Sequence, residues 1–448
     1  MAQGSKPEAL RPQPSGFYRW AVLIFISLAM FGNYYVYDAL SPVADLLISQ
    51  LHFSEANIGL LQGIYSVPNI FTVVLGGMLI DRLGGKRSTM IFGVLCMVGA
   101  VITVLSPHLW LMATGRLVFG IGAESLIVAV TTLLAKWFRG KELSFAFGIN
   151  LTIARLGSFA ALNSPSWAKG LYHSWRPPML LATGMCTLCV VGAAVYWGME
   201  NYAASRYDLG KGGSTDKVVF EDLFKFGMSY WYIVGLCILF YSGIFPFQTF
   251  AVKFFQDAHH ITREAGGFLS SMLTLFAMVA TPLFGLLVDK VGRRALFMMF
   301  GSLLLMPVYL MLAYLPAGAP VHVVIPFIVN AYVPWHLLGI MGIMGVAFSL
   351  IPAVMWPSVA YIVDESKLGT AYGVMTMIQN IGLAGFNFLI GWENTLRLAS
   401  DHNPAGYRLG MWTFSVIGFL GMMFALLLRQ RETGPHGHGL ETITAGGK

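Results

Sequence analysis

The stretch from Gly77 to Arg87 reads GMLIDRLGGKR, and the stretch from Gly285 to Arg294 reads GLLVDKVGRR. Both place a glycine four residues before an aspartate, a basic residue directly after that aspartate, and a second glycine before further basic residues. The second copy begins 208 residues after the first, which is close to half of the 448-residue chain. A motif repeated at this spacing predicts an architecture of two similar halves.

The composition around these motifs is that of a membrane protein. Hydrophobic residues make up 56% of the chain and charged residues 11%, whereas soluble domains carry roughly 25% charged residues. This composition excludes soluble enzymes, disordered chains and fibrous proteins. A helix needs about 20 apolar residues to cross a bilayer, and the sequence contains twelve runs of that kind. They are approximately 20–40, 57–80, 89–107, 109–135, 142–167, 176–199, 228–254, 265–289, 295–315, 335–363, 368–392 and 406–428.

We therefore predict an all-α integral membrane protein with 12 transmembrane helices in two pseudo-symmetric six-helix bundles. The stretch 321–334 is also fairly apolar and is interpreted as an interfacial piece before the tenth span. A polar, glycine-containing stretch separates six spans from six and is interpreted as a linker. The expected parts are an N-terminal tail (1–19), a first bundle (20–199), the linker (200–227), a second bundle (228–428) and a C-terminal tail (429–448).

The basic residues predict how the chain is oriented. If the N-terminus is cytoplasmic, 20 of the 28 lysines and arginines lie in cytoplasmic tails and loops, 6 lie on the other side and 2 lie within spans. This distribution follows the positive-inside rule and places both termini in the cytoplasm. The net charge of +7 is then explained by topology, and no nucleic acid is expected as a partner. The N-terminal tail carries no cleavable signal, and no glycosylation sequon lies outside the membrane, which favours the inner membrane of a bacterium.

No cofactor, metal site or catalytic site is expected. The four cysteines lie in apolar spans, and Cys186 and Cys189 are interpreted as small packing residues. The sequence lacks the G-x-x-x-x-G-K-[ST] pattern of a nucleotide-binding loop. The tail histidines His436 and His438 are interpreted as solvent-exposed, disordered chain. We predict that the protein is not an enzyme.

Few ionisable residues fall inside the predicted membrane spans. Glu124 lies near the middle of the fourth span and Arg155 near the middle of the fifth, while Arg116 and Asp38 lie closer to the outer ends of the fourth and first. Such residues are costly in a membrane unless paired or hydrated, so they are candidates for function. Glu124 and Arg155 could form an internal salt bridge between adjacent helices. They could instead form a split site for a zwitterion, with an ammonium on Glu124 and a carboxylate held bidentately by Arg155.

Polar and aromatic residues of several spans could complete such a site. An amide that faces lipid at mid-span is costly, whereas tyrosine and tryptophan also serve as ordinary packing residues. The candidate substrate-binding residues are Glu124, Arg155, Asn33, Tyr34, Tyr37, Tyr241, Gln248, Trp356, Gln379 and Asn380.

The repeated motif, which follows the second span of each half, resembles the signature loop of the major facilitator superfamily. The resemblance covers roughly residues 18–430 and implies two six-helix bundles around a central cavity that work by alternating access. It implies that Asp81 and Asp289 cap the N-termini of the eleventh and fifth helices. Gly77 and Gly285 would let a neighbouring helix approach closely. The other interpretation is that the acids and basic residues only set the topology.

The fourth span carries a second resemblance. The stretch GRLVFGIG, at 115–122, resembles the superfamily's fourth-helix motif, whose arginine, here Arg116, faces the central cavity. The candidate gating residues are Gly77, Asp81, Arg82, Gly84, Lys86, Arg87, Arg116, Gly285, Asp289, Gly292, Arg293 and Arg294.

Several further strings resemble the lysosomal dipeptide transporters, a branch of this superfamily. They are GNYYVYD (32–38), GRLVFGIGAESL (115–126), WFRGKEL (137–143), ARLGS (154–158), MWPSVAYIV (355–363) and LGTAYGVMTMIQNIGLA (368–384). In that branch an acid of the fourth helix and an arginine of the fifth grip the two ends of a dipeptide. The resemblance therefore implies these roles for Glu124 and Arg155, and transport by uniport. Short tails and absent sequons favour a bacterial-type relative without an accessory subunit. Because alternating access needs only one chain, we expect a monomer.

Two other functions stay open. Proton-coupled symport of peptides or other small organic zwitterions or anions needs a titratable group in the cavity, and Glu124 could supply one. The first span lacks the E-x-x-E-R sequence of the proton-coupled oligopeptide transporters, which favours uniport. A non-transporting sensor or scaffold would need a signalling surface, and the linker and the C-terminal tail offer little of one.

Overall fold

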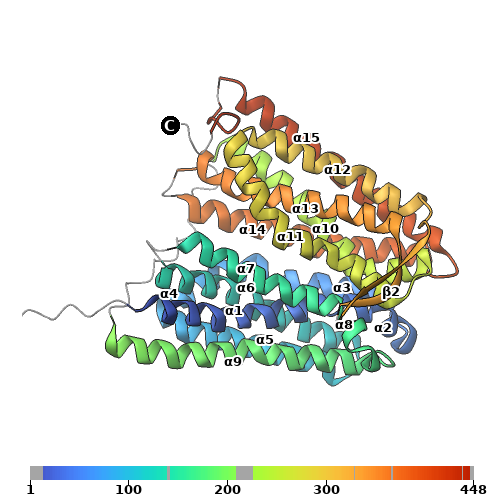
Figure 1. Cartoon of the computed structure of the whole chain (residues 1–448), viewed down its shortest axis with the longest axis horizontal. Coiled ribbons are helices and arrows are strands. Elements are labelled where there is room, and N and C mark those ends of the chain that lie inside the picture. The colour runs from blue at the N-terminus through green and yellow to red at the C-terminus, as the bar shows by residue number, and fades with distance from the viewer. Residues whose placement is uncertain are drawn as a thin grey trace, which may run out of the picture.

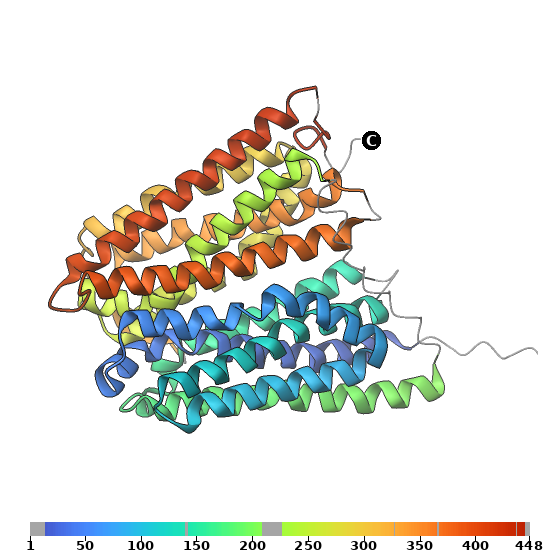
Figure 2. The same ribbon diagram turned by 180° about the vertical axis from the view of Figure 1, so that it is seen from behind.

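The computed structural model describes residues 14–138, 142–207, 226–326, 328–364, 367–435 and 437–443. Long helices make up most of this part and form two groups that lie one above the other in Figures 1 and 2. The first group contains α1 (Gly16–Asp38), η1 (Ser41–Val43), α2 (Ala44–Leu51), α3 (Glu55–Ser66), α4 (Asn69–Leu83), α5 (Gly85–Leu105), α6 (Leu109–Phe138), α7 (Leu143–Leu162), α8 (Ser164–Trp167), η2 (Lys169–Leu171) and α9 (Arg176–Arg206). The second contains α10 (Met228–His259), α11 (Arg263–Val291), α12 (Arg294–Tyr314), β1 (Pro320–Ile325), β2 (Val329–Pro334), α13 (Trp335–Ile362), α14 (Leu368–Leu396), η5 (Pro404–Tyr407) and α15 (Arg408–Glu432).

The all-helical membrane fold is confirmed, with one difference in the spans. Among the described residues, eleven helical segments are long and apolar enough to cross a membrane. The second predicted span, 57–80, divides at Val67 and Pro68 into α3 and α4, and neither piece has the length of a span by itself. Proline has no backbone N–H to donate and its ring crowds the preceding turn, which explains the break. Together α3 and α4 cover the predicted span.

The stretch predicted as an interfacial piece before the tenth span is a β-hairpin. Strands β1 and β2 pair antiparallel over their whole length. Their valine and isoleucine content favours extended backbone. Val329, Ala331 and Val333 alternate along β2 and are buried, and β2 packs against α11. The hairpin therefore belongs to the packed protein and leads directly into α13.

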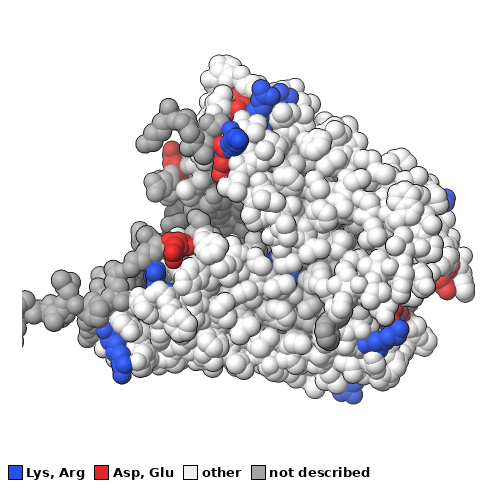
Figure 3. Space-filling model, viewed as in Figure 1, with Lys and Arg blue, Asp and Glu red and all other residues white. Residues whose placement is uncertain are grey.

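The two ends of the molecule differ. We call one end the hairpin end, because it holds β2 together with α2 and α8 (Figure 1). We call the opposite end the linker end, because α9 ends there and α10 begins there. The two helix groups meet toward the hairpin end and diverge toward the linker end (Figure 2). The space-filling view is hollowed between the groups on the linker side (Figure 3).

Small residues allow the groups to meet closely near the hairpin end. A Cβ added at Gly59 of α3 would lie 2.2 Å from the backbone oxygen of Asn387 in α14. A Cβ added at Gly63 would lie 2.8 Å from the backbone oxygen of Ala384. Helices of a membrane protein can approach to this extent only where side chains are absent or small. The contact between α3 and α14 therefore depends on these two glycines.

The C-terminal tail contacts the second group. His438 is exposed, as expected, but two hydrogen bonds hold it against Glu432, so the expectation of a disordered tail is wrong for this residue. Its backbone N–H donates to Glu432 Oε2 at 2.7 Å, and its Nδ1 lies 2.9 Å from Glu432 Oε1. Leu440 is fully buried. The Ala295 N–H at the start of α12 donates to Glu441 Oε1 at 2.7 Å. His436 lies outside the described residues.

Candidate functional site

A cavity of about 260 Å³ lies where the two helix groups face each other. Its lining comes from α1, α3, α6 and α7 of the first group and from α10, α13 and α14 of the second. The lining residues are Asn33, Tyr34, Tyr37, Asp38, Tyr65, Glu124, Ile127, Arg155, Tyr241, Phe245, Trp356, Thr376, Gln379 and Leu383. Because both groups contribute, a movement of one group against the other would change the shape of this cavity.

Glu124 reaches the cavity from α6 and is oriented by a tyrosine. The Tyr65 hydroxyl donates to Glu124 Oε1 at 3.1 Å. Tyr65 is itself packed edge-on by Tyr37, with ring centres 4.8 Å apart. No other hydrogen bond within the described chain reaches the Glu124 carboxylate. Its second oxygen can therefore accept a hydrogen bond from a ligand.

Arg155 reaches the cavity from α7 and is surrounded by aromatic rings. Its Cζ lies 5.4 Å from the centre of the Tyr34 ring, 5.5 Å from Phe348 and 6.0 Å from Phe245. Cation–π contacts of this kind hold a guanidinium without consuming its hydrogen-bond donors. In the described part of the chain no ion pair joins Arg155 to Glu124. The interpretation of the two as an internal salt bridge has no support in this conformation.

The second helix group contributes a wall that is aromatic and polar but uncharged. Trp356 Nε1 of α13 donates to the Tyr241 hydroxyl of α10 at 2.9 Å. Cys237 Sγ of α10 donates a hydrogen bond to Gln379 Oε1 of α14 at 3.7 Å. All ionisable acids and bases that line the cavity are therefore in the first group.

Eight of the ten predicted substrate-binding residues line the cavity. Gln248 and Asn380 do not line it in this conformation. Both are buried, and Asn380 Nδ2 donates to the Thr376 backbone oxygen within α14 at 3.0 Å. Successive residues of a helix point about 100° apart, so Asn380 points away from the cavity that the preceding Gln379 lines.

Four residues that could contribute to a site were not among the predicted set. They are Asp38, Tyr65, Phe245 and Thr376. Asp38 follows Tyr34 by four residues and Phe245 follows Tyr241 by four, and this spacing places each pair on one helix face. Asp38 was already a candidate for function as an ionisable residue within a span, and the periodicity could have found Phe245 as well. Tyr65 has no such signal, because it lies on α3, which carries no other predicted site residue.

Arg116 does not line the cavity, contrary to the expectation that it faces it. Its guanidinium donates to the backbone oxygens of Val36 at 3.1 Å, Leu61 at 3.3 Å and Tyr37 at 3.4 Å, and to the Gln62 side chain. It is 1% exposed. Arg116 therefore joins α6 to the end of α1 and to α3.

The second glycines of the two repeated motifs have the same backbone role. Gly84 has φ +81° and Gly292 has φ +71°, a region that side chains with a Cβ rarely adopt. For the first glycine of each motif, Gly77 and Gly285, the expected role was to let a neighbouring helix approach closely. A Cβ at Gly285 would meet nothing within 4 Å, so no helix of the described part of the chain approaches it closely in this conformation. The surroundings of Gly77 and the side chain of Asp81 lie outside the described residues.

The charged motif residues of the second half interact locally. Arg294 is buried, donates to Asp289 Oδ1 at 2.7 Å and lies 4.7 Å from the centre of the Tyr361 ring. Arg293 donates its backbone N–H to the Glu441 backbone oxygen at 3.1 Å. Asp289 thus has a partner in its own half in this conformation.

In the first half, Lys86 Nζ donates to Asn201 Oδ1 at 2.6 Å. Arg82 and Arg87 are exposed at the linker end.

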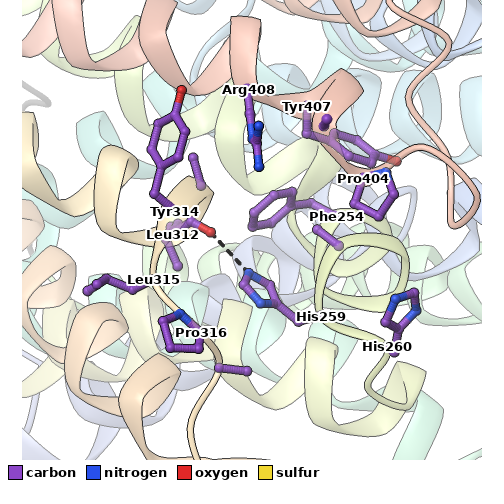
Figure 4. Close-up of a pocket in the computed structure, with 14 residues that line it drawn as sticks. Phe254, His259, His260, Leu312, Tyr314, Leu315, Pro316, Pro404, Tyr407 and Arg408 are labelled. Atoms are coloured by element: carbon purple, nitrogen blue, oxygen red, sulfur yellow. Dashed lines mark hydrogen bonds between the residues drawn. The ribbon is translucent and has the colours of Figure 1, made fainter.

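A second cavity, of about 400 Å³, lies at the hairpin end of the second group, between the ends of α10 and α12 and the start of α15 (Figure 4). His259 is one of its lining residues, and the distance from His259 Nε2 to the Leu312 backbone oxygen is 3.1 Å. Arg408 points into the same space in Figure 4. None of the predicted substrate-binding or gating residues lines this cavity.

A model of the Major Facilitator Superfamily matches residues 26–387 and 247–444 of the chain. The chain belongs to the major facilitator superfamily. This member of the superfamily is 34% identical to the lysosomal dipeptide transporter MFSD1 of Danio rerio over 84% of its length and 80% of that protein. It is 30% identical to the Homo sapiens protein of the same name over 87% of its length and 83% of that protein.

Solved transporter structures share its fold. The nucleoside transporter NupG matches with a TM-score of 0.70 at 13% identity, over 91% of this chain and 99% of that one. A bacterial homologue of the human lysosomal transporter Spinster, in an inward-facing and occupied conformation, matches with a TM-score of 0.69 at 17% identity, over 93% and 98% of the two chains. At such identities the likeness concerns the fold. The family match, the named relatives and the apolar helices together show that the protein is a multi-pass membrane transporter of this superfamily.

Proposed function

We propose that this transporter carries dipeptides across the membrane. The observation that carries the proposal is the pair Glu124 and Arg155, which line one cavity between the helix groups without forming an ion pair. A dipeptide has one free ammonium and one free carboxylate, which these two side chains complement. The name of the vertebrate relatives, lysosomal dipeptide transporter, supports the same substrate class.

In the proposed complex, Glu124 accepts hydrogen bonds from the peptide ammonium and Arg155 donates two parallel hydrogen bonds to the peptide carboxylate. Each charge-assisted contact contributes roughly 1.5–3 kcal/mol. Two such contacts, less the cost of desolvation, support affinities in the micromolar to millimolar range, which suits a carrier that must also release its substrate. The uncharged wall of Tyr241, Trp356 and Gln379 would face the peptide's side chains.

Transport would proceed by alternating access. Among the residues that the structure describes, three ion pairs join the two helix groups at the hairpin end: Lys253 with Glu55 at 2.9 Å, Lys169 with Glu264 at 2.7 Å, and Arg263 with Asp45. We propose that these pairs separate when the hairpin end opens. The linker end would then close, with Asp81 and Asp289 moving to the N-termini of helices in the opposite half.

We further propose that the linker end is cytoplasmic, that the membrane is the inner membrane of a bacterium, and that the protein acts as a monomeric uniporter without an accessory subunit. Proton-coupled symport of peptides or other small zwitterions or anions is the second candidate. One observation favours it: the cavity lining contains two carboxylates, Asp38 and Glu124, but one arginine.

The test is uptake of radiolabelled Ala-Ala into proteoliposomes that contain the purified protein, with and without an imposed proton gradient. Protein-free liposomes and the Glu124→Gln variant are the controls. Uptake that is independent of the gradient, and competed by dipeptides but not by free alanine, supports a dipeptide uniporter. Accumulation driven by the gradient supports symport. Absence of uptake under both conditions, with protein that is demonstrably inserted, contradicts the proposed substrate class.

A further inference from the structure

The second cavity, of about 400 Å³, lies where three membrane spans end. It shares no lining residue with the cavity that contains Glu124 and Arg155. Of its lining residues, His259 is the last of α10, Tyr314 is the last of α12 and Arg408 is the first of α15. The ends of membrane-spanning helices lie where the hydrocarbon core of a bilayer gives way to the lipid headgroups. The cavity is therefore at headgroup depth on the hairpin side.

The lining of this cavity carries basic groups without acidic ones. The described residues that line it include Arg408, His259 and His260, and no aspartate or glutamate. Arg408 points into the cavity (Figure 4). Its Cζ lies 5.0 Å from the centre of the Tyr314 ring, and in the described part of the chain its guanidinium has no ion pair or hydrogen bond. A cation–π contact leaves the N–H donors of a guanidinium free, so they are available to an anion.

The rim of the cavity has the side chains of a membrane interface. Trp412 Nε1 of α15 donates to the Tyr314 hydroxyl of α12 at 2.9 Å, and the two residues are 47% and 52% exposed. Tryptophan and tyrosine are enriched at headgroup depth. Val416 follows Trp412 by one helical turn and Leu303 precedes Tyr314 by about three turns, so each shares a face with its aromatic residue. Both are about half exposed, and they continue the rim as an apolar surface for acyl chains.

We propose that this cavity binds the headgroup of an anionic phospholipid. Arg408 donates two parallel hydrogen bonds to the lipid phosphate, the geometry in which a guanidinium binds phosphate best. A lipid supplies the acyl chains that the apolar surface below the rim accommodates, which a soluble phosphate does not. The basic lining favours phosphatidylglycerol over phosphatidylcholine, because the quaternary ammonium of the latter is repelled by Arg408.

The cavity is one side chain away from a contact between the two helix groups. Tyr407 lines it and is 2% exposed. The Tyr407 hydroxyl donates to Asp257 Oδ2 at 2.6 Å and lies 3.2 Å from Oε1 of Glu55, which belongs to the first group. A headgroup packed beside Tyr407 holds this side chain in place, so binding favours the closed hairpin end. This consequence rests on the proposed alternating access, whereas the binding itself does not.

Binding is tested by melting curves of the purified full chain in detergent, titrated with dioleoylphosphatidylglycerol or dioleoylphosphatidylcholine. We expect the half-maximal rise in melting temperature at a concentration about 10-fold lower for phosphatidylglycerol, the lower end of what one charge-assisted hydrogen bond provides. In Arg408→Gln this ratio should fall to near 1. Arg397→Gln is the matched control, because Arg397 is also exposed and follows α14 at the hairpin end but does not line the cavity. It should keep the natural ratio.

Three results would overturn the site. They are equal effects of the two lipids on the natural protein, a natural ratio in Arg408→Gln, and an equal loss of the ratio in Arg397→Gln, which would reduce the effect to general surface charge. Glycerol phosphate carries the same anion without acyl chains and should give no rise at the same concentrations. A rise equal to that with phosphatidylglycerol would assign the cavity to a soluble phosphate and overturn the lipid as its source.

The link to the hairpin end is tested with Ser166→Cys. Ser166 Oγ is buried on α8, which packs against α11 of the other group, so a thiol reagent reaches this position when the hairpin end opens. Labelling should be slower in phosphatidylglycerol liposomes than in phosphatidylcholine liposomes, and this difference should vanish when Arg408→Gln is added. Equal rates in the two lipids would overturn the link. None of these measurements requires transport, so a protein that takes up no Ala-Ala contradicts the proposed function and leaves the lipid site standing.

Discussion

Lys253 Nζ of α10 lies 2.9 Å from Glu55 Oε1 of α3, and both side chains are less than one-tenth exposed. Lys253 also pairs with Asp257 on its own helix. The Tyr407 hydroxyl, which lies 2.9 Å from Lys253 Nζ, donates to Asp257 Oδ2 at 2.6 Å and lies 3.2 Å from Glu55 Oε1. One buried lysine therefore joins the two helix groups at the hairpin end.

The first prediction concerns this lysine. Lys253→Met leaves Glu55 and Asp257 buried without their cation, and breaking a buried pair in this way typically costs about 3–5 kcal/mol. We expect a lower melting temperature and a conformational equilibrium shifted toward an open hairpin end. The rate at which a thiol reagent labels a cysteine introduced at the hairpin end measures the shift of this equilibrium.

Lys169→Met is the matched control, because Lys169 makes the second lysine pair across the groups but is 77% exposed. An exposed pair contributes less than about 1 kcal/mol. If both variants lowered stability and increased labelling to the same extent, the buried position of Lys253 would not be the cause.

The second prediction concerns the approach of α3 to α14. In Gly63→Ala the new Cβ would lie 2.8 Å from the Ala384 backbone oxygen, so the two helices must move apart. We expect reduced transport and easier labelling at the hairpin end. Gly148→Ala on α7 is the control, because its Cβ would meet nothing within 4 Å and alanine is favoured in helices over glycine by up to about 1 kcal/mol. Normal transport by Gly63→Ala would show that the close approach is not required.

The third prediction concerns the proposed split site. Glu124→Gln and Arg155→Ala should each reduce the apparent affinity for Ala-Ala by roughly 10-fold or more, because each removes one charge-assisted contact. Arg155→Lys should not restore affinity, since an ammonium cannot form the two parallel hydrogen bonds of a guanidinium. Concentration-dependent uptake and melting curves measure these effects. Folded variants that transport Ala-Ala as the natural protein does would show that the pair is structural.

The fourth prediction concerns the packed C-terminal tail. Glu441 accepts from the Ala295 N–H at the start of α12 and lies with Oε2 3.9 Å from Arg429 Nε. Glu441→Ala should lower stability by about 0.5–2 kcal/mol, as does the loss of a capping side chain. Glu441→Gln, which keeps an acceptor oxygen, should lose less. The affinity for peptide should not change. A melting temperature equal to that of the natural protein would argue against a capping role.

Much of the architecture follows from local features of the sequence. The length of each apolar run is set by the thickness of a bilayer, so the helices and the all-helical class could be predicted without knowing their packing. The duplicated motif also indicated two halves without any knowledge of the packing, because its spacing can be read directly from the sequence. Glu124 and Arg155 were found because a charge in an apolar run is conspicuous wherever the helix points. The exception is 57–80, where Pro68 interrupts the backbone and makes two helices of one apolar run.

The tertiary structure decided which side chains face one another. Helix rotation turns Asn380 away from the cavity that Gln379 lines, although the two are adjacent in sequence. The packing of α6 on α1 and α3 gives Arg116 backbone oxygens as partners and keeps it out of the cavity. The same packing brings Asp38 and Tyr65 into it. An apolar run determines that a helix forms, whereas its rotation and its neighbours depend on contacts between segments that are far apart in the chain.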